Sequence, residues 1–429
     1  MRSKAAISGL SAAIRARAIR IGCSTRPTLV DSNGGVRKLR HLLPLCAIGL
    51  LAACARVIPA TDGPGPVPPA GATAAAMGAV QVPALSFASI SGSELRADFD
   101  AFRLSCRVAT SREDQSGLTR TEDWEAPCNA ATEWPRERAA EFFATQFVPV
   151  RVGDGSAFAT GYFEPEILGS RTRRSAGDVP VYAPPRDLER CWRDDIPERE
   201  RTGRAPLSRR TPDGGCVPHY TRAEIEQGAL DGSSEVLAYA SDPVEFFFLQ
   251  IQGSGRIRDP QTGEIIRIGY ANQNGHAYTG IGGVMRERGL LGDGPGQFAG
   301  SMQGIMQYIR ENPQEGAELM RLNESWVFFR ELEGEGPIGS IGVPVRARNA
   351  VAVDPKYVPY GAPVLLDLDR DVADGIWIAQ DTGGAIRGAN RFDTFWGGGA
   401  EAREIAGGMS GRGPAVILLP HASAARLSR

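Results

Sequence analysis

Two aspartates, Asp381 and Asp393, bracket a glycine-rich stretch in the last fifth of the chain. Gly383 and Gly384 leave backbone exposed there, so a bulky ligand can approach it closely. Three aromatic residues surround Asp393 with apolar surface: Phe392, Phe395 and Trp396. Burial against such rings raises the pKa of a carboxyl group and keeps it protonated near neutrality, which makes it a general acid. The alternative is a glycine-rich turn in which both aspartates cap backbone N–H groups.

Other residues with chemical potential form weaker patterns. A Ser–His–Asp triad would need His219, His276 or His421, and the chain has no nucleophile elbow. Glu164 precedes Pro165 and could face a groove, although an exposed pre-proline residue is the simpler interpretation. No group of His, Cys and Asp residues has the spacing of metal ligands, and there is neither a P-loop nor a dinucleotide fingerprint. We therefore expect no metal and no organic cofactor.

Short strands punctuated by Gly, Pro and Asp are predicted to position the two aspartates. In the C-terminal part they cover 326–329, 350–353, 363–366, 376–378 and 415–419, after earlier strands at 148–152 and 158–163. Several short strands in one run favour a small closed barrel. The strand 376–378 delivers Asp381 to its edge, where a rigid scaffold often presents a catalytic group.

Helices are predicted before and between these strands. Four starts are marked by capping or first-turn residues, namely Ser93, Pro135, Thr221 and Pro313, and two further short helices are predicted near 280–289 and 301–310. Leu95, Phe99 and Phe102 follow Ser93 with helical spacing. The dense apolar run Val244–Ile251 is predicted to be a strand.

Charge separates the N-terminal segment from the rest of the chain. Residues 1–53 hold nine basic residues and one acid, a balance of +8, which leaves −10 for the remainder of a chain with net charge −2. Within this segment an apolar stretch at 42–53 follows three basic residues, is too short for a membrane span and suits a secretory signal. It ends at Cys54 in a pattern that resembles a bacterial lipobox, so we expect Cys54 to carry lipid.

A plain secretory signal and a buried cysteine are the alternatives for this segment. Residues 54–83 are rich in Pro, Gly and Ala and are predicted to form a flexible tether. Export to an oxidising compartment would also permit disulfide bonds between the four cysteines that follow. Three connectivities are possible for these four residues. We favour Cys106–Cys128 and Cys191–Cys216 because each pair is close in sequence, and free buried thiols are the alternative.

Length and composition limit the remaining choices. The 429 residues suggest two or three domains, and 42 % apolar residues are enough to build a core. The 52 glycines and 30 prolines favour a β-rich architecture with many turns. The near-neutral net charge argues against a nucleic-acid partner, which would require a basic face.

The stretch 381–396, together with 352–361, resembles the three-aspartate domain, whose three acids would be Asp354, Asp381 and Asp393. Upstream, five short motifs resemble the membrane-bound lytic murein transglycosylase A family in their order along the chain: Gly161–Pro165, Gln252–Gly255, Tyr270–Ala271, Asn274–Tyr278 and Trp326–Phe329. The resemblance runs from about Phe158 to Leu419.

The resemblance implies a mainly β fold with some α structure. It implies a double-psi β-barrel domain assembled from two chain segments, with a smaller β domain inserted between them and a groove between the two domains. We place the first barrel segment, with its N-terminal helices, at 84–166 and the inserted domain at 167–321. The second barrel segment is placed at 322–429, with the three-aspartate domain at about 348–420.

The resemblance also implies a reaction, the cleavage of the β-1,4 bond between N-acetylmuramic acid and N-acetylglucosamine in peptidoglycan with formation of a 1,6-anhydro end. The protein would be a peptidoglycan lytic exotransglycosylase, a carbon–oxygen lyase, that acts on glycan strands from the periplasm while lipid anchors it to the outer membrane. Asp393 would be the single catalytic acid/base, Asp381 a second acid in the groove and Asp354 a structural acid.

Further residues are expected to bind the sugars. Hydrogen bonds would come from Gln252, Ser254, Asn274 and the backbone at Gly383 and Gly384, and stacking from Tyr162, Tyr278 and Trp396. Two alternatives remain, a polysaccharide hydrolase that uses Asp381 and Asp393 as a pair and a wall-binding lipoprotein without activity.

Overall fold

The structure is a computed structural model that describes residues 72–334 and 336–427. The predicted signal segment, Cys54 and most of the predicted tether therefore lie outside the described residues. The tether was predicted to extend to residue 83, and for its described part this prediction is wrong. Helix α1 (Ala74–Met77) and strand β1 (Ala79–Gln81) form there. Strand β1 pairs antiparallel with β2 (Phe147–Val152) and so belongs to the folded body. No helix within these described ranges has the length and apolar character needed to cross a bilayer.

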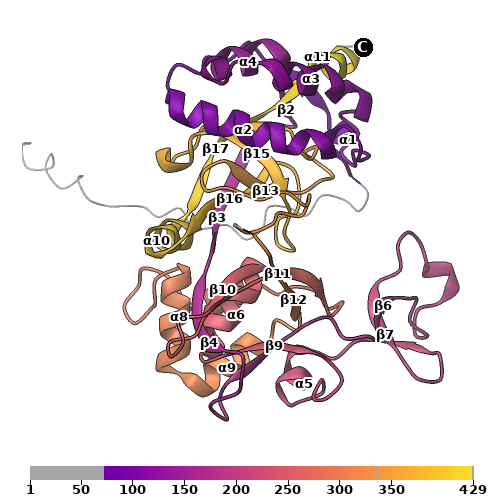
Figure 1. Ribbon diagram of the computed structural model, residues 1–429, viewed down its shortest axis with the longest axis vertical. Helices are drawn as coiled ribbons and strands as arrows, with labels where there is room; N and C mark the ends of the chain where they lie inside the picture. Colours follow the sequence, from indigo (N-terminus) through magenta and orange to yellow (C-terminus); the bar gives the residue numbers. More distant parts are fainter. Residues whose placement is uncertain (1–71, 335, 428–429) are drawn as a thin grey trace, which may run out of the picture. The chain divides into compact units, whose positions relative to one another are not determined.

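Six strands form a closed barrel (Figure 1). They are β3 (Ser156–Glu164), β13 (Ala350–Val353), β14 (Pro363–Leu366), β15 (Gly375–Asp381), β16 (Arg391–Gly398) and β17 (Ser410–Pro420). The ring runs β17–β14–β15–β13–β16–β3 and closes because β3 also pairs with β17. Only β3 comes from the first chain segment, which confirms a barrel assembled from two distant parts of the sequence. The double-psi connectivity stays a prediction.

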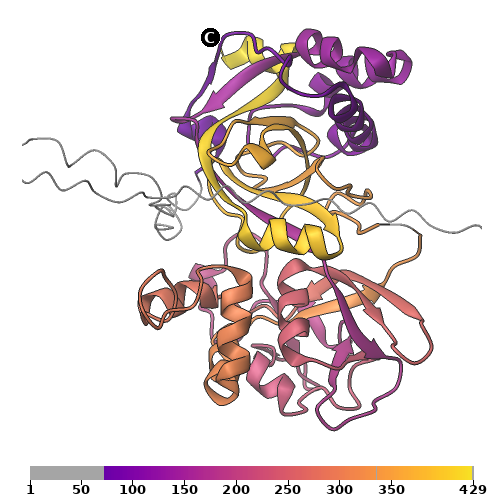
Figure 2. The same ribbon diagram turned by 90° about the vertical axis from the view of Figure 1, so that its left-hand side faces the viewer.

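Helices cover the barrel (Figures 1 and 2). They are α2 (Gly92–Ala109), η1 (Thr121–Trp124), α3 (Glu125–Glu133), η2 (Arg136–Arg138), α4 (Ala139–Gln146), η4 (Asp371–Ala373), α10 (Ala400–Gly408) and α11 (His421–Leu427). The cap of α2 is Ser91 and not the predicted Ser93, because Ser91 and Glu94 have the spacing of a reciprocal capping box and form one. The disulfide Cys106–Cys128, which was the favoured pairing, joins α2 to α3.

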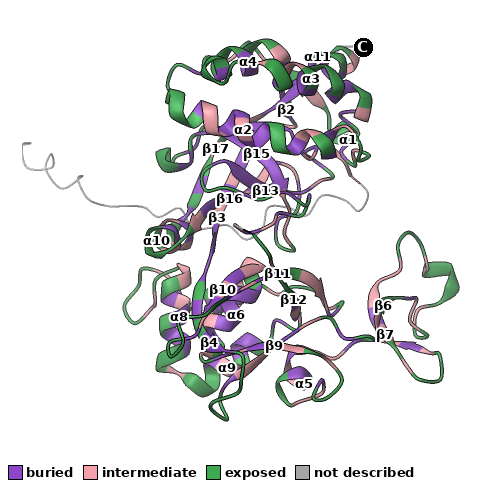
Figure 3. Cartoon of the chain, viewed as in Figure 1, coloured by how far each residue is buried: buried purple, intermediate pink, exposed green. Residues whose placement is uncertain are grey.

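The barrel and its helices share one hydrophobic core (Figure 3). The helices contribute fully buried aromatic side chains, among them Phe99, Phe102 and Phe142, whose rings meet edge to face or tilted. The strands contribute every second residue, such as Phe392 and Trp396 on β16. The residues between these point to the opposite face, where Phe395 joins a smaller cluster with Tyr162.

The inserted part is built on a six-stranded sheet with the order β12–β11–β10–β4–β9–β5. Its strands are β4 (Glu166–Ser170), β5 (Val179–Tyr182), β9 (Val236–Ala240), β10 (Ser254–Arg258), β11 (Ile265–Gln273) and β12 (Val327–Glu331). Strand β12 pairs with β11, although we expected residues 326–329 in the second barrel segment. The sheet of the insert thus extends ten residues beyond the predicted boundary at 321.

Five helices accompany this sheet, namely α5 (Arg222–Glu226), α6 (Pro243–Gln252), α7 (Ile281–Glu287), α8 (Met302–Glu311) and α9 (Pro313–Arg321). Helix α6 replaces the strand predicted at Val244–Ile251. Asp242 caps it by accepting the N–H groups of Val244 and Glu245, and Pro243 occupies the first turn. The run misled the prediction because α6 is buried between two cores, which hold Phe246 and Phe247 respectively, and so shows no polar face.

A separate three-stranded sheet consists of β6 (Leu188–Arg190), β7 (Leu207–Arg210) and β8 (Cys216–Val217), with the short helix η3 (Glu198–Glu200) in the loop between β6 and β7. The disulfide Cys191–Cys216, also the favoured pairing, holds this sheet together. The sheet carries none of the predicted catalytic residues.

Candidate active site

Asp381 and Asp393 lie in one row across four strands of the barrel. In the strand register Asp381 of β15 is opposite Ala352 of β13, Ala352 is opposite Asp393 of β16, and Asp393 is opposite Thr160 of β3. Neighbouring strands are about 4.8 Å apart, so the two aspartates are separated by about 10 Å at the backbone.

Asp393 accepts a single hydrogen bond in the described part of the chain. The hydroxyl of Thr160 donates to its Oδ1 atom at 2.5 Å, and Oδ2 has no partner there. Burial raises the pKa of the Asp393 carboxyl; the positive charge of Arg391 and the Thr160 hydrogen bond lower it, and the negative charge of Asp381 raises it again. Asp393 is thus a half-buried acid with one oxygen held and one available for proton transfer.

Asp381 is more fully satisfied. Its Oδ1 accepts the backbone N–H groups of Ser340 and Thr382, both at 2.9 Å, and its Oδ2 accepts the hydroxyl of Tyr162 at 3.0 Å. Burial raises the pKa of Asp381, while these three hydrogen bonds lower it. With all these donors directed at it, Asp381 is suited to hold neighbouring groups in place.

Two of the predicted sugar-binding tyrosines lie beside the acids. Tyr162 is buried against Phe395, and burial together with the charge of Asp381 raises the pKa of its hydroxyl. Tyr278 keeps 38 % of its surface exposed, and desolvation and the charge of Asp393 raise its pKa. A Cβ atom at Gly384 would lie 3.8 Å from that of Tyr278, so the glycine loop and Tyr278 are neighbours.

Asp354 is buried and accepts two backbone N–H groups, and its structural role stays a prediction. Its Oδ2 accepts the N–H of Gly388 at 2.9 Å and its Oδ1 accepts the N–H of Lys356 at 3.1 Å. Because Gly388 belongs to the loop between the two acids, the buried Asp354 side chain fixes the path of that loop. Gly383 lies in the same loop, where a Cβ atom would approach Ile386 to 3.0 Å.

Two predicted sugar-binding residues are buried elsewhere. Asn274 is 0 % exposed, donates to the carbonyls of Tyr220 and Glu324, and accepts the N–H of Trp326, so its side chain is a structural link in the insert. Trp396 is 5 % exposed, and the Arg348 guanidinium lies 4.9 Å from the centre of its ring. Neither residue is available to a sugar, so both of these predictions are wrong.

Gln252 and Ser254 lie at the end of α6 and the start of β10. The Oε1 atom of Gln252 accepts the N–H of Phe163 at 3.0 Å, so this side chain joins the insert to β3. Ser254 is half-buried and pairs with Gly269 in the sheet. Sugar binding by these two residues stays a prediction.

The sequence interpretation missed Thr160 and Arg391 on the acid-bearing face, and it favoured an exposed position for Glu164. Thr160, Tyr162 and Glu164 occupy every second position of β3, and Arg391 precedes Asp393 by two positions on β16, so the period of a strand could have revealed them. Glu164 is buried rather than exposed. Its Oε1 atom has no hydrogen-bond partner among the residues that the structure describes, and burial raises its pKa. His276, considered above as a triad member, bonds to Glu324 and to the carbonyl of His219.

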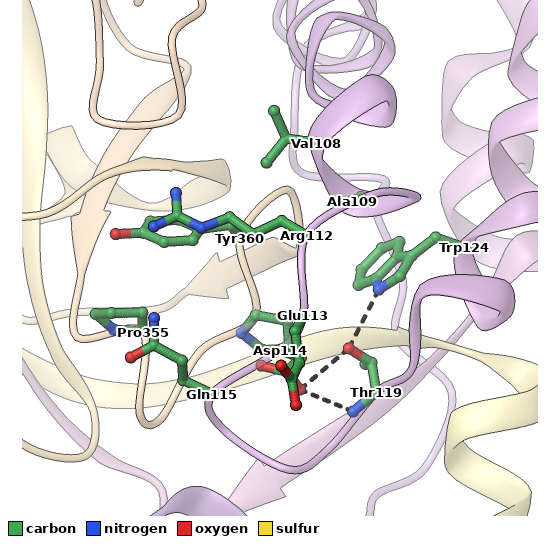
Figure 4. Close-up of a pocket in the computed structure, with 11 residues that line it drawn as sticks. Val108, Ala109, Arg112, Glu113, Asp114, Gln115, Thr119, Trp124, Pro355 and Tyr360 are labelled. Carbon is green, nitrogen blue, oxygen red and sulfur yellow. Dashed lines mark hydrogen bonds between the residues drawn. The ribbon is translucent and has the colours of Figure 1, made fainter. Parts of the chain in front are cut away.

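One pocket lies apart from these residues, between the end of α2 and the loop that follows β13 (Figure 4). Figure 4 shows the guanidinium of Arg112 over the ring of Tyr360, at 4.7 Å from its centre, and Asp114 bonded to the hydroxyl and the N–H of Thr119. Its lining includes none of the predicted site residues. Arg112 is engaged by the Tyr360 ring and Asp114 by Thr119, so we assign the pocket no chemistry.

Comparison with known proteins matches two family models to the chain. The model described as the MltA specific insert domain covers residues 158–330, and the model of the 3D domain covers residues 349–419. The second range contains both acids of the row and Asp354.

Individual relatives agree with these models. Membrane-bound lytic murein transglycosylase A of Vibrio cholerae is 31 % identical over 62 % of this chain and 66 % of its own length, so the chain spans about two thirds of that relative. The crystal structure of a membrane-bound lytic murein transglycosylase from Agrobacterium tumefaciens is 30 % identical with a TM-score of 0.70, over 82 % of this chain and 99 % of that one. The crystal structure of E. coli MltA with bound chitohexaose is 25 % identical with a TM-score of 0.55, over 80 % and 94 % of the two chains.

Proposed function

The chain belongs to the membrane-bound lytic murein transglycosylase A family, and on this premise we propose that it cleaves the glycan strands of peptidoglycan by lytic transglycosylation. The bond cleaved would be the β-1,4 link between N-acetylmuramic acid and N-acetylglucosamine, with a 1,6-anhydro end as product. The relative crystallised with chitohexaose, a β-1,4-linked polymer of N-acetylglucosamine, supports this class of substrate.

The observation that carries the proposal is that the two acids differ in how many of their carboxylate oxygens accept hydrogen bonds. Asp393 has one oxygen held by Thr160 and a second without a hydrogen bond from the described residues, whereas both oxygens of Asp381 accept donors. A glycosidase that activates water normally needs a second carboxylate free to do so. A lytic transglycosylase needs only one free carboxyl, because the substrate supplies its own nucleophile.

The reaction follows from one proton that leaves Asp393 and returns to it. Protonated Asp393 gives its proton to the glycosidic oxygen, the bond to C1 of the muramic acid breaks, and an oxocarbenium-like centre forms. The Asp393 carboxylate then takes the proton of the C6 hydroxyl, whose oxygen closes on C1. The two steps restore the enzyme and add no water, and the nucleophile is intramolecular and therefore acts at a high effective concentration.

The neighbouring residues support this cycle. The negative charge of Asp381 raises the pKa of Asp393 and so favours the protonated starting state. Asp381 also fixes the hydroxyl of Tyr162, while Tyr278 and the glycine loop line the same face. Neither step of the cycle calls for a metal or an organic cofactor.

We also propose that the protein acts from the periplasm while anchored to the outer membrane through lipid on Cys54. Support comes from the lipobox-like sequence and from relatives that are named membrane-bound. Cell fractionation tests the anchor, because Cys54→Ser should move the protein out of the membrane fraction; retention there would contradict it.

Digestion of purified peptidoglycan sacculi tests the activity, with mass spectrometry of the released fragments. The proposal expects anhydro ends, which are one water lighter than hydrolysed ends. Hydrolysed ends would instead indicate the two-carboxylate hydrolase, and binding without release would indicate a wall-binding protein. The size of the earliest fragments separates attack from chain ends, which is the exo mode we expect, from attack within chains.

A further inference from the structure

We propose that Arg391 is a positioning residue that acts through the hydroxyl of Thr160 to keep the acidic proton of Asp393 on Oδ2, the oxygen that Thr160 does not touch. The inference rests on the acid/base role proposed for Asp393. It adds a residue whose task is to direct that acid and does not involve contact with the substrate.

Two hydrogen bonds connect the three side chains. The Nη2 atom of Arg391 donates to Oγ1 of Thr160 at 2.8 Å, and Oγ1 of Thr160 donates to Oδ1 of Asp393 at 2.5 Å. The strand register produces this arrangement, because Thr160 of β3 is opposite Asp393 of β16 and Arg391 lies two positions earlier on the same face of β16. A further bond from Nη1 of Arg391 to the carbonyl of Phe392 holds the guanidinium against its own strand.

The direction of the hydrogen bonds follows from what each group can donate. A guanidinium has only donors, so the Thr160 hydroxyl must accept from Arg391. The cation on one side favours donation of the single hydroxyl proton to Asp393 on the other side. Oδ1 of Asp393 is then an acceptor, so the proton of the neutral carboxyl resides on Oδ2. This is the oxygen that has no partner among the described residues and can reach a substrate.

Two guanidinium groups lie near the ring of Phe158. The guanidinium of Arg391 lies 4.9 Å from the centre of the Phe158 ring, and the guanidinium of Arg412 on β17 lies 4.8 Å from the centre of the same ring. Arg412 makes no hydrogen bond to Thr160. It therefore provides a matched control, a second arginine on the same ring without the proposed connection.

The charges around Asp393 show what Arg391 adds. The titratable groups that act on Asp393 or respond to it are Arg391 on β16, Asp381 on β15, Tyr162 on β3 and Tyr278 before α7. Helix α10 packs on the other face of β3 and β16 through its buried alanines Ala402 and Ala406; its two glutamates are exposed and Arg403 donates to Glu245. Arg391 is the cation in this set that lowers the pKa of Asp393.

The test compares the pH dependence of kcat/KM for three variants with that of the wild type, using sacculi as substrate. Catalysis starts from protonated Asp393, so kcat/KM falls as pH rises through the pKa of that group. Arg391→Met removes the charge that lowers this pKa, so the basic limb should move to higher pH. It also frees the Thr160 hydroxyl, so kcat/KM at the optimum should fall about tenfold. Arg391→Lys should restore part of both, and Arg412→Met should change neither.

A double-mutant cycle separates positioning from charge. In a Thr160→Val background the hydroxyl link is absent, so Arg391→Met should cause little further loss at the optimum while still moving the basic limb. A wild-type profile for Arg391→Met, or the same shift for Arg412→Met, would overturn the proposal. Thermal melts confirm that each variant is folded.

The outcome is separable from the fate of the proposed function. If the wild type releases anhydro fragments and Asp393→Asn does not, the acid/base role stands whatever Arg391→Met does. If the wild type releases none, the proposed function fails, and the binding of Arg391 to Thr160 is left without a catalytic acid to direct.

Discussion

Two faces of the barrel each bury an aspartate with a raised pKa, and only one of them resembles an active site. On helix α2, burial raises the pKa of its residue Asp98 to about 8, opposed by the hydrogen bond that Asn349 donates at 2.6 Å. On the other face, burial raises the pKa of Asp393, opposed first by the charge of Arg391. Strand β15 serves both faces, since Gln380 bonds to Ala101 and Ser105 of α2 while the next residue, Asp381, accepts Tyr162.

The difference between the faces is what surrounds the acid. Asp98 is almost fully buried and accepts a hydrogen bond from the side-chain amide of Asn349. A substrate therefore cannot reach its carboxyl group to exchange a proton with it. Asp393 is half-buried, has an oxygen without a partner in the described chain, and lies among a cation, a second carboxylate and two tyrosines. A raised pKa alone therefore does not identify a catalytic acid; access and neighbouring charges do.

The largest expected effect lies on the acid-bearing face. Asp393→Asn should lower the rate of release of anhydro fragments by about a thousandfold or more, because the amide cannot give up and retrieve a proton. The side chain keeps its shape and can still accept from Thr160, so the melting temperature should stay close to that of the wild type. Mass spectrometry of digested sacculi measures the rate, and near-normal activity would refute the assignment of Asp393.

A smaller effect is expected at the other end of the same row. Asp381→Asn should lower the rate about tenfold, because the new amide can still accept from Ser340 and Thr382 but no longer presents a negative charge to Tyr162 and Asp393. The same digest, run beside Asp393→Asn, gives the comparison. Equal losses in the two variants would show that both carboxylates do chemistry and would favour the hydrolase.

The smallest effect on activity is expected on α2, where Asp98→Asn should change stability instead. The raised pKa of about 8 means that folding favours the proton, so wild-type stability is fully present below the unfolded pKa near 3.9 and falls as pH rises toward 8. The slope in that window is about 1.4 kcal/mol per pH unit. Urea unfolding at pH 5 and pH 7 should show a steeper loss of stability in the wild type than in the variant, by about this amount, with unchanged activity. Equal slopes would show that Asp98 is not the group responsible.

Local patterns with a single physical reading were predictable from the sequence. The strands at 350–353, 363–366 and 415–419 lie as expected, since apolar β-formers bounded by glycine and proline have few other options. The helix at Val244–Ile251 was missed, because an element that packs against two cores has the same apolar run whether it is helix or strand. Asp242 at the cap and Pro243 in the first turn were the residues in the sequence that indicated a helix and not a strand.

The site was predictable in its acids and not in their partners. Asp381 and Asp393 stand in an unusual motif, whereas Thr160 and Arg391 matter only through a strand register that joins residues more than 230 positions apart. Trp396 was misassigned for a related reason. It alternates with Phe395 along β16, and both rings are buried, Trp396 in the barrel core and Phe395 in the smaller cluster with Tyr162, which the sequence pattern alone does not show.

The early position of strand β3 in the sequence affects when the active site can form. Thr160 and Tyr162 come from this early strand, and they hold acids that are synthesised 233 and 219 residues later. On the proposed function, a nascent or clipped chain that lacks either part has no oriented proton donor, so activity would arise only with ring closure. Such an enzyme would be inert toward the wall of its own cell until β16 has paired with β3.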